Sequence, residues 1–514
     1  MMRIVAKIKS SIVVLMTTIV ISKLIGMLRD VVLANYYGTS NISDAYLIAI
    51  SVPTLLFYFI SHALSTAFLP MYNKIRETGG KEAAQTYTNN LLCIAFCACT
   101  VIVAVLLLFP EFIIKIFATG FDDKTLALTT KLVQYSAGSV YFMTIINIWG
   151  GYLQADSNFI VPASISIPRN VVLIVSIAVS TQFGIEHLGV GILFAYIAEF
   201  LLLLPFVFKS GFHFQPKFQL NSPEMRETLY LILPIIIGVG VSQINKIVDK
   251  SIASTIVSGG ISALSYAAII NNAIQEVLVT GIITVLFAKC SAWVAEENHE
   301  KVKEKLSETI SVMAFLLIPA SLGVIICAES IVVCILCRGE FTATSLHMTV
   351  NALRCYTCGL TFLAIRDTLV KVFYAYKNTK TTTVTSIGAI ILNIVLNLIL
   401  SRFWGINGLA IATSVSAIVQ SLTLYVILHR KIGDFGTHSI FVTGMQSLAS
   451  GFIMVAAISL LRNMLLSAGI GEFSGLVIQI LAGFVVYMFC SLLFRSSILL
   501  KWIRKFASRG QNKS

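Results

Sequence analysis

The sequence predicts an all-α polytopic membrane protein of about 14 transmembrane helices, and three observations lead to that prediction. Of its 514 residues, 57% are hydrophobic and 12% are charged, whereas charged residues make up about 25% of ordinary soluble proteins. The mean hydropathy is +0.88. The apolar residues are gathered in runs of about 20, the length that a helix needs to cross a bilayer. These observations exclude a soluble protein.

Each expected helix is an apolar run that ends at charged residues, glycine or a polar turn. The runs lie at residues 11–28, 45–70, 91–109, 131–154, 159–182, 188–208, 228–251, 262–288, 307–336, 349–375, 383–401, 406–428, 439–461 and 474–494. The polar stretches between them are only connectors, so no soluble domain is expected. The first run follows Arg3, contains Lys23 and lacks a small-residue cleavage site. We therefore interpret it as a retained helix and not as a signal peptide.

The net charge of +13 is explained by the expected topology. When both termini and alternate loops are placed on one side of the membrane, most Lys and Arg residues fall on that side. The positive-inside rule then predicts that both termini are cytoplasmic. Because this distribution accounts for the charge, no nucleic-acid partner is expected. The ten cysteines lie in or beside apolar runs, and we expect them to pack as small hydrophobic residues.

The chain contains an internal repeat. Ser22 aligns with Ser242, and Tyr46 aligns with Tyr266 at the same offset. Independent tripeptides that align at nearly this offset lie at residues 183–185 and 404–406. A repeat of six helices keeps its orientation in the membrane, as in transporters that bind substrate between two parallel halves and alternate access. The predicted domains are an N-terminal lobe at 1–215, a C-terminal lobe at 216–432, and the last two helices with a basic tail at 433–514.

Ionisable and strongly polar side chains recur in the first two helices of each half. A charged residue costs about 2.5–3.5 kcal/mol at the bilayer centre, so such residues usually mark a pathway or a binding site. A salt bridge at the membrane surface is the alternative for Arg29 and Asp30. Snorkelling is the alternative for Lys23, and an interhelical hydrogen bond is the alternative for His62. The candidate substrate-binding residues are Lys23, Arg29, Asp30, Asp44, His62, Lys246, Asp249, Lys250, Asn272 and Glu276.

Three uncharged oxygens form a weak candidate sodium site in the second half. Asn393 and Asn397 are spaced i, i+4, and Thr413 lies on the following helix. Hard cations prefer such oxygen ligands, but no carboxylate accompanies them, so interhelical hydrogen bonding is the alternative. No cofactor is expected. Coupling to Na⁺, to H⁺ or to the membrane potential stays open.

Short motifs are spread over nearly the whole chain. They are SKLIGMLRD at residues 22–30, DAY at 44–46, AFLP at 67–70, TGF at 119–121, IVDK at 247–250, ISALSYA at 261–267, RGEF at 338–341 and FYAYKNTKT at 373–381. Together they resemble the MviN/MurJ family of lipid II flippases, within the multidrug/oligosaccharidyl-lipid/polysaccharide (MOP) exporter superfamily.

The resemblance implies a flippase that moves lipid II, a polyprenyl-pyrophosphate-linked cell-wall precursor, from the cytoplasmic to the outer leaflet by alternating access. It implies a role in peptidoglycan biosynthesis and cell shape, in the bacterial plasma (inner) membrane. Helices 1, 2, 7 and 8 would line a cationic cavity, and the last two helices would form a groove for the lipid tail. The expected partners are the undecaprenyl-pyrophosphate-linked glycan, the lipid bilayer and cell-wall synthesis enzymes.

Two departures from the family pattern bear on the substrate. Phe57 and Tyr58 follow the Pro-Thr-Leu-Leu motif where the family often has arginine, and Ile269 or Ile270 replaces a second arginine. Arginine binds phosphate bidentately and lysine only as a point charge, so fewer cavity arginines leave open a flippase for another envelope glycan lipid. A small-molecule or drug antiporter of the same superfamily is the other alternative. The short outer loops lack the carboxylate arrangement of a glycosyltransferase, so no enzyme is expected.

Overall fold

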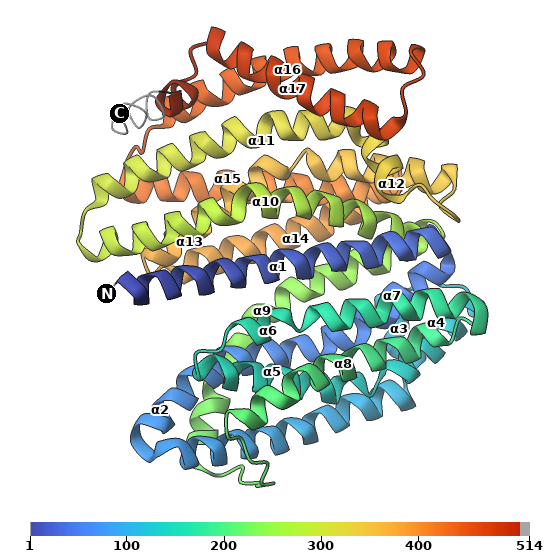
Figure 1. Cartoon of the computed structure of the whole chain (residues 1–514), viewed down its shortest axis with the longest axis vertical. Helices are drawn as coiled ribbons and strands as arrows, with labels where there is room; N and C mark the ends of the chain where they lie inside the picture. Colours follow the sequence, from blue (N-terminus) through green and yellow to red (C-terminus); the bar gives the residue numbers. More distant parts are fainter. Residues whose placement is uncertain (1, 504–514) are drawn as a thin grey trace. The chain divides into compact units, whose positions relative to one another are not determined.

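The computed structural model describes the backbone of residues 2–503, and in that part of the chain all regular secondary structure is helical (Figure 1). Side chains are described there except at residues 2–13, 59–60, 62–63, 65, 233–239, 241–242 and 466. The helices are α1 (Met2–Tyr37), α2 (Asn41–Leu108), α3 (Pro110–Phe117), α4 (Asp123–Ser136), α5 (Ser139–Ala155), α6 (Ile160–Ser164), α7 (Ser166–Phe183), α8 (His187–Lys209), α9 (Pro223–Ile256), α10 (Gly260–Ala295), α11 (His299–Leu336), α12 (Ala343–Thr357), α13 (Leu360–Ala375), α14 (Thr379–Trp404), α15 (Ile406–Ile432), α16 (Thr437–Ser467) and α17 (Glu472–Leu493).

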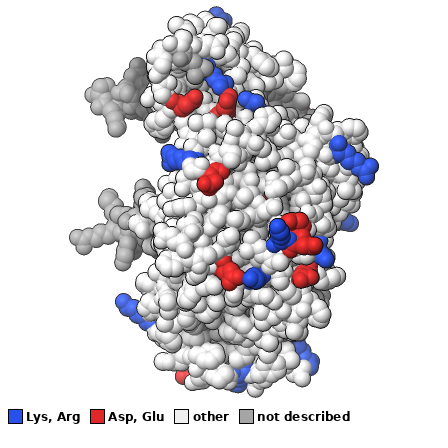
Figure 2. All heavy atoms as spheres, turned by 90° about the vertical axis from the view of Figure 1, so that its right-hand side faces the viewer, with Lys and Arg blue, Asp and Glu red and all other residues white. Residues whose placement is uncertain are grey.

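The prediction of an all-α polytopic membrane protein is confirmed. Within the described residues, ten helical segments are long and apolar enough to cross a membrane, and the bent pair α12–α13 adds an eleventh if it is one span. The runs predicted at 11–28 and 228–251 lie on α1 and α9 and include side chains outside the described set. Figure 2 shows a face on which most residues are uncharged and the charged side chains form a few small groups.

Some boundaries differ from the predicted runs for local reasons. The run at 131–154 is divided between α4 and α5, because the chain turns at Ala137 and Gly138. The runs at 45–70 and 91–109 lie in the two helices that make up α2, and these meet at a kink at Gly80, where φ is +79°. Glycine adopts a positive φ without steric cost. The charged residues around Gly80, among them Glu77, Lys81 and Glu82, separate the two runs in the sequence, whereas no charged residue marks the turn at Ala137 and Gly138.

Polar residues in the connectors fix where several helices begin. The side chains of Ser40, Asp122 and Thr342 accept hydrogen bonds from the backbone N–H groups of Ser43, Thr125 and Ser345. Asn298 and Asn378 cap α11 and α14 in the same way. A helix leaves its first N–H groups without partners, and short polar side chains satisfy them. These caps place the helix starts next to the polar loops.

The chain forms two compact units. Unit 1 comprises the residues up to Ser262 together with Arg338–Phe341, and unit 2 comprises the other residues after Ser262. Helix α9 belongs to unit 1, where it packs against α2 and α3. The domain boundaries at 215 and 432 come from the sequence repeat, and they stay a prediction.

Unit 1 is packed around α2, which contacts α4, α5 and α9. Tyr72, Tyr152 and Phe212 are fully buried, and the Tyr152 ring packs edge-on against both of the others. Helices α7 and α8 approach closely at Gly191, where an added Cβ would overlap the Ser176 hydroxyl. Small residues allow this packing in membranes, because lipid supplies no hydrophobic drive between helices.

Unit 2 is built from two groups of helices. Helix α11 packs against α16, and α16 packs against α17. The Tyr487 hydroxyl on α17 donates to the Phe315 carbonyl on α11 at 2.6 Å. Helices α13, α14 and α15 form the second group, with Phe373 and Leu424 in a core that also includes Leu306 of α11. Helix α11 thus contributes to this core as well as to the core that it shares with α16 and α17.

Candidate functional site

The Arg29–Asp30 pair lies on α1, and its partners are inside unit 1. The Arg29 guanidinium donates to Asp30 Oδ1 at 2.6 Å and 3.0 Å, and to Asn170 Oδ1 on α7 at 3.3 Å. Asp30 is buried, whereas the Arg29 side chain keeps 22% exposure. Charge-assisted bonds of this kind hold a guanidinium in one orientation. Arg29 is thus held on α1 with part of its surface open.

Lys23 lies two turns earlier on α1 and is exposed. The neighbouring Ser22 is buried and donates to the Ala163 carbonyl at 3.3 Å. The side chain of His62, the candidate on α2, lies outside the described residues. The α1 candidates in the described part are therefore Lys23, Arg29 and Asp30.

Asp44 is fully buried in the first turn of α2, and its carboxylate caps the N-terminus of another helix, α10. Its two carboxylate oxygens accept from the backbone N–H groups of Gly259 at 2.9 Å and Ser262 at 2.7 Å. These residues are the turn before α10 and the first turn of α10, and both belong to unit 1. A carboxylate at a helix N-terminus satisfies free N–H groups and interacts favourably with the helix dipole. Asp44 therefore holds the α9–α10 turn against α2.

The α9 candidates face α2 within unit 1. The Lys250 ammonium donates to the Ser51 hydroxyl, and the Lys246 Nζ lies 6.0 Å from the centroid of the Tyr58 ring. Asp249 accepts from the side-chain amide of Asn245 at 3.3 Å. A cation over an aromatic face is attracted by the ring quadrupole. Lys246 and Lys250 are one helical turn apart and form a cationic strip along α2.

Two loops of unit 1, at residues 338–341 and 119–121, pack against the ends of α1 and α9 through backbone contacts. The Glu340 N–H donates to the Asn35 carbonyl at 2.9 Å. At Gly339, where φ is +56°, an added Cβ would overlap the Asn35 carbonyl. At Gly120 an added Cβ would overlap the backbone of Ser254, whose hydroxyl accepts from the Gly120 N–H at 3.0 Å. The glycines of the RGEF and TGF motifs therefore allow close backbone packing.

The remaining substrate candidates are on α10 in unit 2. Asn272 and Glu276 are exposed, and the adjacent Gln275 donates to Asp367 at 2.9 Å. Asp367 also pairs with Arg366 at 2.7 Å. The polar face of α10 thus contains one amide tied to α13 and two exposed polar side chains.

The three candidate sodium ligands bond to one another in unit 2. Asn397 donates to Asn393 at 2.9 Å, and the Asn393 amide lies 3.5 Å from the Thr413 hydroxyl. Both asparagines are buried. The first bond lies within α14, and the second joins α14 to α15. The sodium site stays a prediction.

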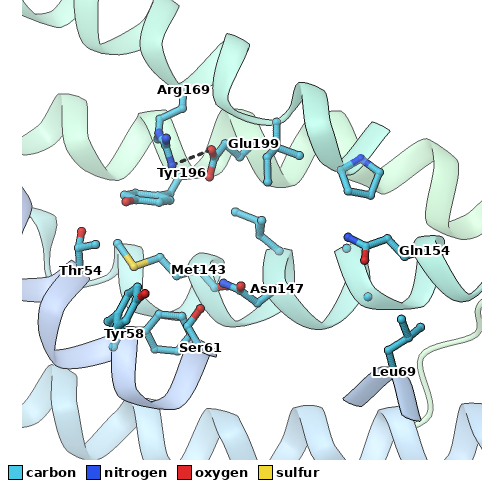
Figure 3. A pocket seen from close by; sticks show the side chains of 16 residues that line it. Thr54, Tyr58, Ser61, Leu69, Met143, Asn147, Gln154, Arg169, Tyr196 and Glu199 are labelled. Carbon is cyan, nitrogen blue, oxygen red and sulfur yellow. Dashed lines mark hydrogen bonds and ion pairs between the residues drawn. The ribbon is translucent and has the colours of Figure 1, made fainter. Parts of the chain in front are cut away.

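A polar cavity inside unit 1 was not anticipated from the sequence. It has a volume of about 310 Å³ and lies among α2, α5, α7 and α8. Arg169 Nη1 of α7 is 3.1 Å from Glu199 Oε1 of α8, and Arg169 also lies 5.7 Å from the Tyr196 ring centroid (Figure 3). Glu199 is a single carboxylate in an apolar run, the same signal that singled out Glu276. The position of Glu199 inside an apolar run was therefore a signal in the sequence that could have identified this residue.

Comparison with known proteins identifies relatives over most of the chain. A family model described as "Lipid II flippase MurJ" matches residues 33–476. "Probable lipid II flippase MurJ" of Thermotoga maritima is 27% identical over 492 residues, which are 94% of this chain and 96% of that protein. The corresponding protein of Vibrio cholerae is 28% identical over 438 residues, 82% of each chain. "Lipid II flippase MurJ" of Thermosipho africanus is 28% identical over 486 residues, 94% of this chain and 96% of that one.

Two solved structures match most of this chain. "Lipid II flippase MurJ, inward closed conformation" has a TM-score of 0.81 at 27% identity and covers 95% of this chain and 100% of its own. An inward-facing multidrug resistance MATE family transporter of the MOP superfamily has a TM-score of 0.68 at 15% identity, covering 82% of this chain and 98% of its own. At that identity the second likeness shows a shared fold alone.

Proposed function

Because the chain belongs to the lipid II flippase MurJ family, we propose that it moves lipid II from the cytoplasmic leaflet to the outer leaflet of the membrane. The observation that carries the proposal is the family match over residues 33–476. The ten membrane-length helical segments in the described residues support it. The family is one of transporters and not of enzymes, so no catalytic residue is assigned.

The pyrophosphate of the substrate requires cations in a low-dielectric surrounding. Arg29 is the candidate for bidentate binding, because its guanidinium is already oriented by Asp30 and Asn170. Lys246 and Lys250 supply two further charges along α2, and Lys23 supplies a fourth. The cationic strip of Lys246 and Lys250 supports the idea that lysines compensate for the two cavity arginines that the family often has and this chain lacks.

The acidic candidates balance those cations when no substrate is bound. Asp30 already pairs with Arg29 at 2.6 Å, and Asp249 lies one residue from Lys250 on α9. A buried unpaired charge is strongly destabilising, so pairing keeps the empty transporter stable. Asn272 and Glu276 are proposed to contact the polar sugar–peptide part of the substrate.

The finer cellular placement is also part of the proposal. The protein resides in the bacterial plasma (inner) membrane with both termini in the cytoplasm, as the distribution of Lys and Arg favours. Its substrate is made by enzymes on the cytoplasmic side and consumed outside, so cell-wall synthesis enzymes are its proposed partners.

Energy for directional transport comes from an ion gradient or from the membrane potential. Sodium binding would require the side-chain oxygens of Asn393 and Asn397 to turn toward the ion. The Thr413 hydroxyl would be the third ligand. An Asn397→Ala variant would then lose sodium dependence in vesicles. If flipping ignores a sodium gradient but follows the membrane potential, the amide cluster has a packing role only.

The experiment that tests the proposed function is depletion of the protein in its source organism. Lipid II should accumulate on the cytoplasmic side, as measured by mass spectrometry of extracted lipids and by its inaccessibility to external probes. Accumulation of a different lipid-linked glycan would identify that glycan as the substrate and overturn the assignment to lipid II.

A further inference from the structure

We propose that the cavity among α2, α5, α7 and α8 of unit 1 binds one sugar ring of the lipid-linked glycan. The inference rests on the proposed function, because it assigns part of the same substrate to a site that is separate from the phosphate-binding cations. All the residues involved belong to unit 1.

The size of the cavity limits what it can hold. Its volume of about 310 Å³ is at the lower end of the range for small-molecule sites, about 300–1,000 Å³. A single pyranose ring fits within that volume, whereas a whole disaccharide–peptide head group does not. The cavity is therefore a subsite for one part of a larger ligand.

The walls combine aromatic rings with polar groups. Phe57 and Tyr58 of α2 and Tyr196 of α8 supply the rings. Figure 3 shows Glu199 and Arg169 on one side of the space, with Asn147 and Tyr58 across from them. The faces of a sugar ring are apolar and its rim carries hydroxyls, so this combination suits a carbohydrate.

Polar atoms in the cavity are available to hydroxyl groups. Glu199 is 1% exposed, and its Oε1 accepts no hydrogen bond, although Arg169 Nη1 is 3.1 Å away. The Asn147 amide donates to the Met143 carbonyl at 2.7 Å, which leaves the Asn147 side-chain oxygen as an acceptor. A buried carboxylate oxygen without a hydrogen bond is costly. A ligand hydroxyl would satisfy it.

The charge of the cavity selects against a phosphate. Arg169 and Glu199 are its only charged lining residues in the described part of the chain, and their charges cancel. A pyrophosphate would need a net positive site, whereas a neutral ring with hydroxyl and amide groups needs paired donors and acceptors. The neutral cavity thus complements a sugar.

Tyr58 connects the cavity to the cationic strip. Its ring lines the cavity, and the Lys246 ammonium lies 6.0 Å from the ring centroid. Ser51, which accepts from Lys250, is two turns from Tyr58 on the same face of α2. A sugar attached to a pyrophosphate can therefore occupy the cavity while its phosphate contacts the lysines.

The test compares two ligands on the full-length protein in nanodiscs. The probes are lipid II and undecaprenyl pyrophosphate, which lacks the sugars. Glu199→Gln removes the acceptor charge and keeps the shape. Gln154 also lines the cavity, and Gln154→Ala removes its amide without changing a charge. Glu329→Gln is the matched control, because Glu329 also pairs with an arginine, Arg462, at 2.8 Å but lies in unit 2.

We expect Glu199→Gln to weaken lipid II binding by about tenfold and to leave undecaprenyl pyrophosphate binding unchanged, because one charge-assisted hydrogen bond is lost. Gln154→Ala should show the same selectivity, and Glu329→Gln should change neither affinity. Equal weakening for both ligands, or no weakening in either cavity variant, would overturn the sugar subsite while the proposed function stands. If the unmodified protein did not bind lipid II, the proposed function itself would fail, and the subsite with it.

Discussion

Arg29 has two acceptors within reach, Asp30 and Asn170, and both are carried by helices rather than loops. Arg29→Ala leaves the buried Asp30 carboxylate uncompensated, so we expect the free energy of unfolding to fall by about 3 kcal/mol. Thermal unfolding in detergent measures this. Arg226→Ala serves as the control, because Arg226 is exposed, and equal melting temperatures for the two variants would contradict the buried pair.

The second prediction concerns the cap that the Asp44 carboxylate provides for α10. Asp44→Ala leaves the N–H groups of Gly259 and Ser262 without their acceptor, so a stability loss of about 2 kcal/mol is expected. Asp44→Asn can still accept one of these bonds and should lose less. Hydrogen exchange at residues 259–262 reads the cap directly, and unchanged protection in the alanine variant would refute it.

The cost of polar groups in lipid explains which single residues could be predicted. Arg29, Asp30 and Asp44 stood out because charges are rare inside apolar runs. Their partners did not, because Asn170 and the Gly259 N–H become acceptor and donor only when distant segments meet. Glu199 carries the same signal, because it is a single carboxylate inside the apolar run at 188–208.

At the scale of the element, close backbone approach depends on glycine. Gly339→Ala should lower the melting temperature, because it combines a φ of +56° with overlap of the Asn35 carbonyl. The φ alone costs about 1–2 kcal/mol. Gly471→Ala is the control, since a Cβ there meets nothing within 4 Å and its φ is −59°. Equal melting temperatures would mean that the RGEF loop does not pack as described.

Helix type and approximate position followed from hydropathy, whereas one break did not. The charged residues around Gly80 divide the runs at 45–70 and 91–109, which are the two helices joined at the kink in α2. The turn at Ala137 and Gly138 lies inside a run that has no charged residue from 132 to 155. A window of about 20 residues averages over it.

At the scale of the whole molecule, the charge distribution predicts topology. A cysteine at Lys301 should react with a membrane-impermeant maleimide only after the cells are opened, whereas a cysteine at Lys124 should react in intact cells. The variants would be made in a background without the ten natural cysteines. Labelling of position 301 from outside would reverse the orientation.

The measurement that tests the central claim most directly is flipping of fluorescent lipid II in proteoliposomes, read by quenching of the outer leaflet. The purified protein should make an additional fraction of the lipid accessible to quencher, and it should not do so for a fluorescent phospholipid of similar size. Movement of lipid II no faster than in protein-free liposomes, with the membrane potential and ion gradients supplied, would contradict the assignment of this chain as a lipid II flippase.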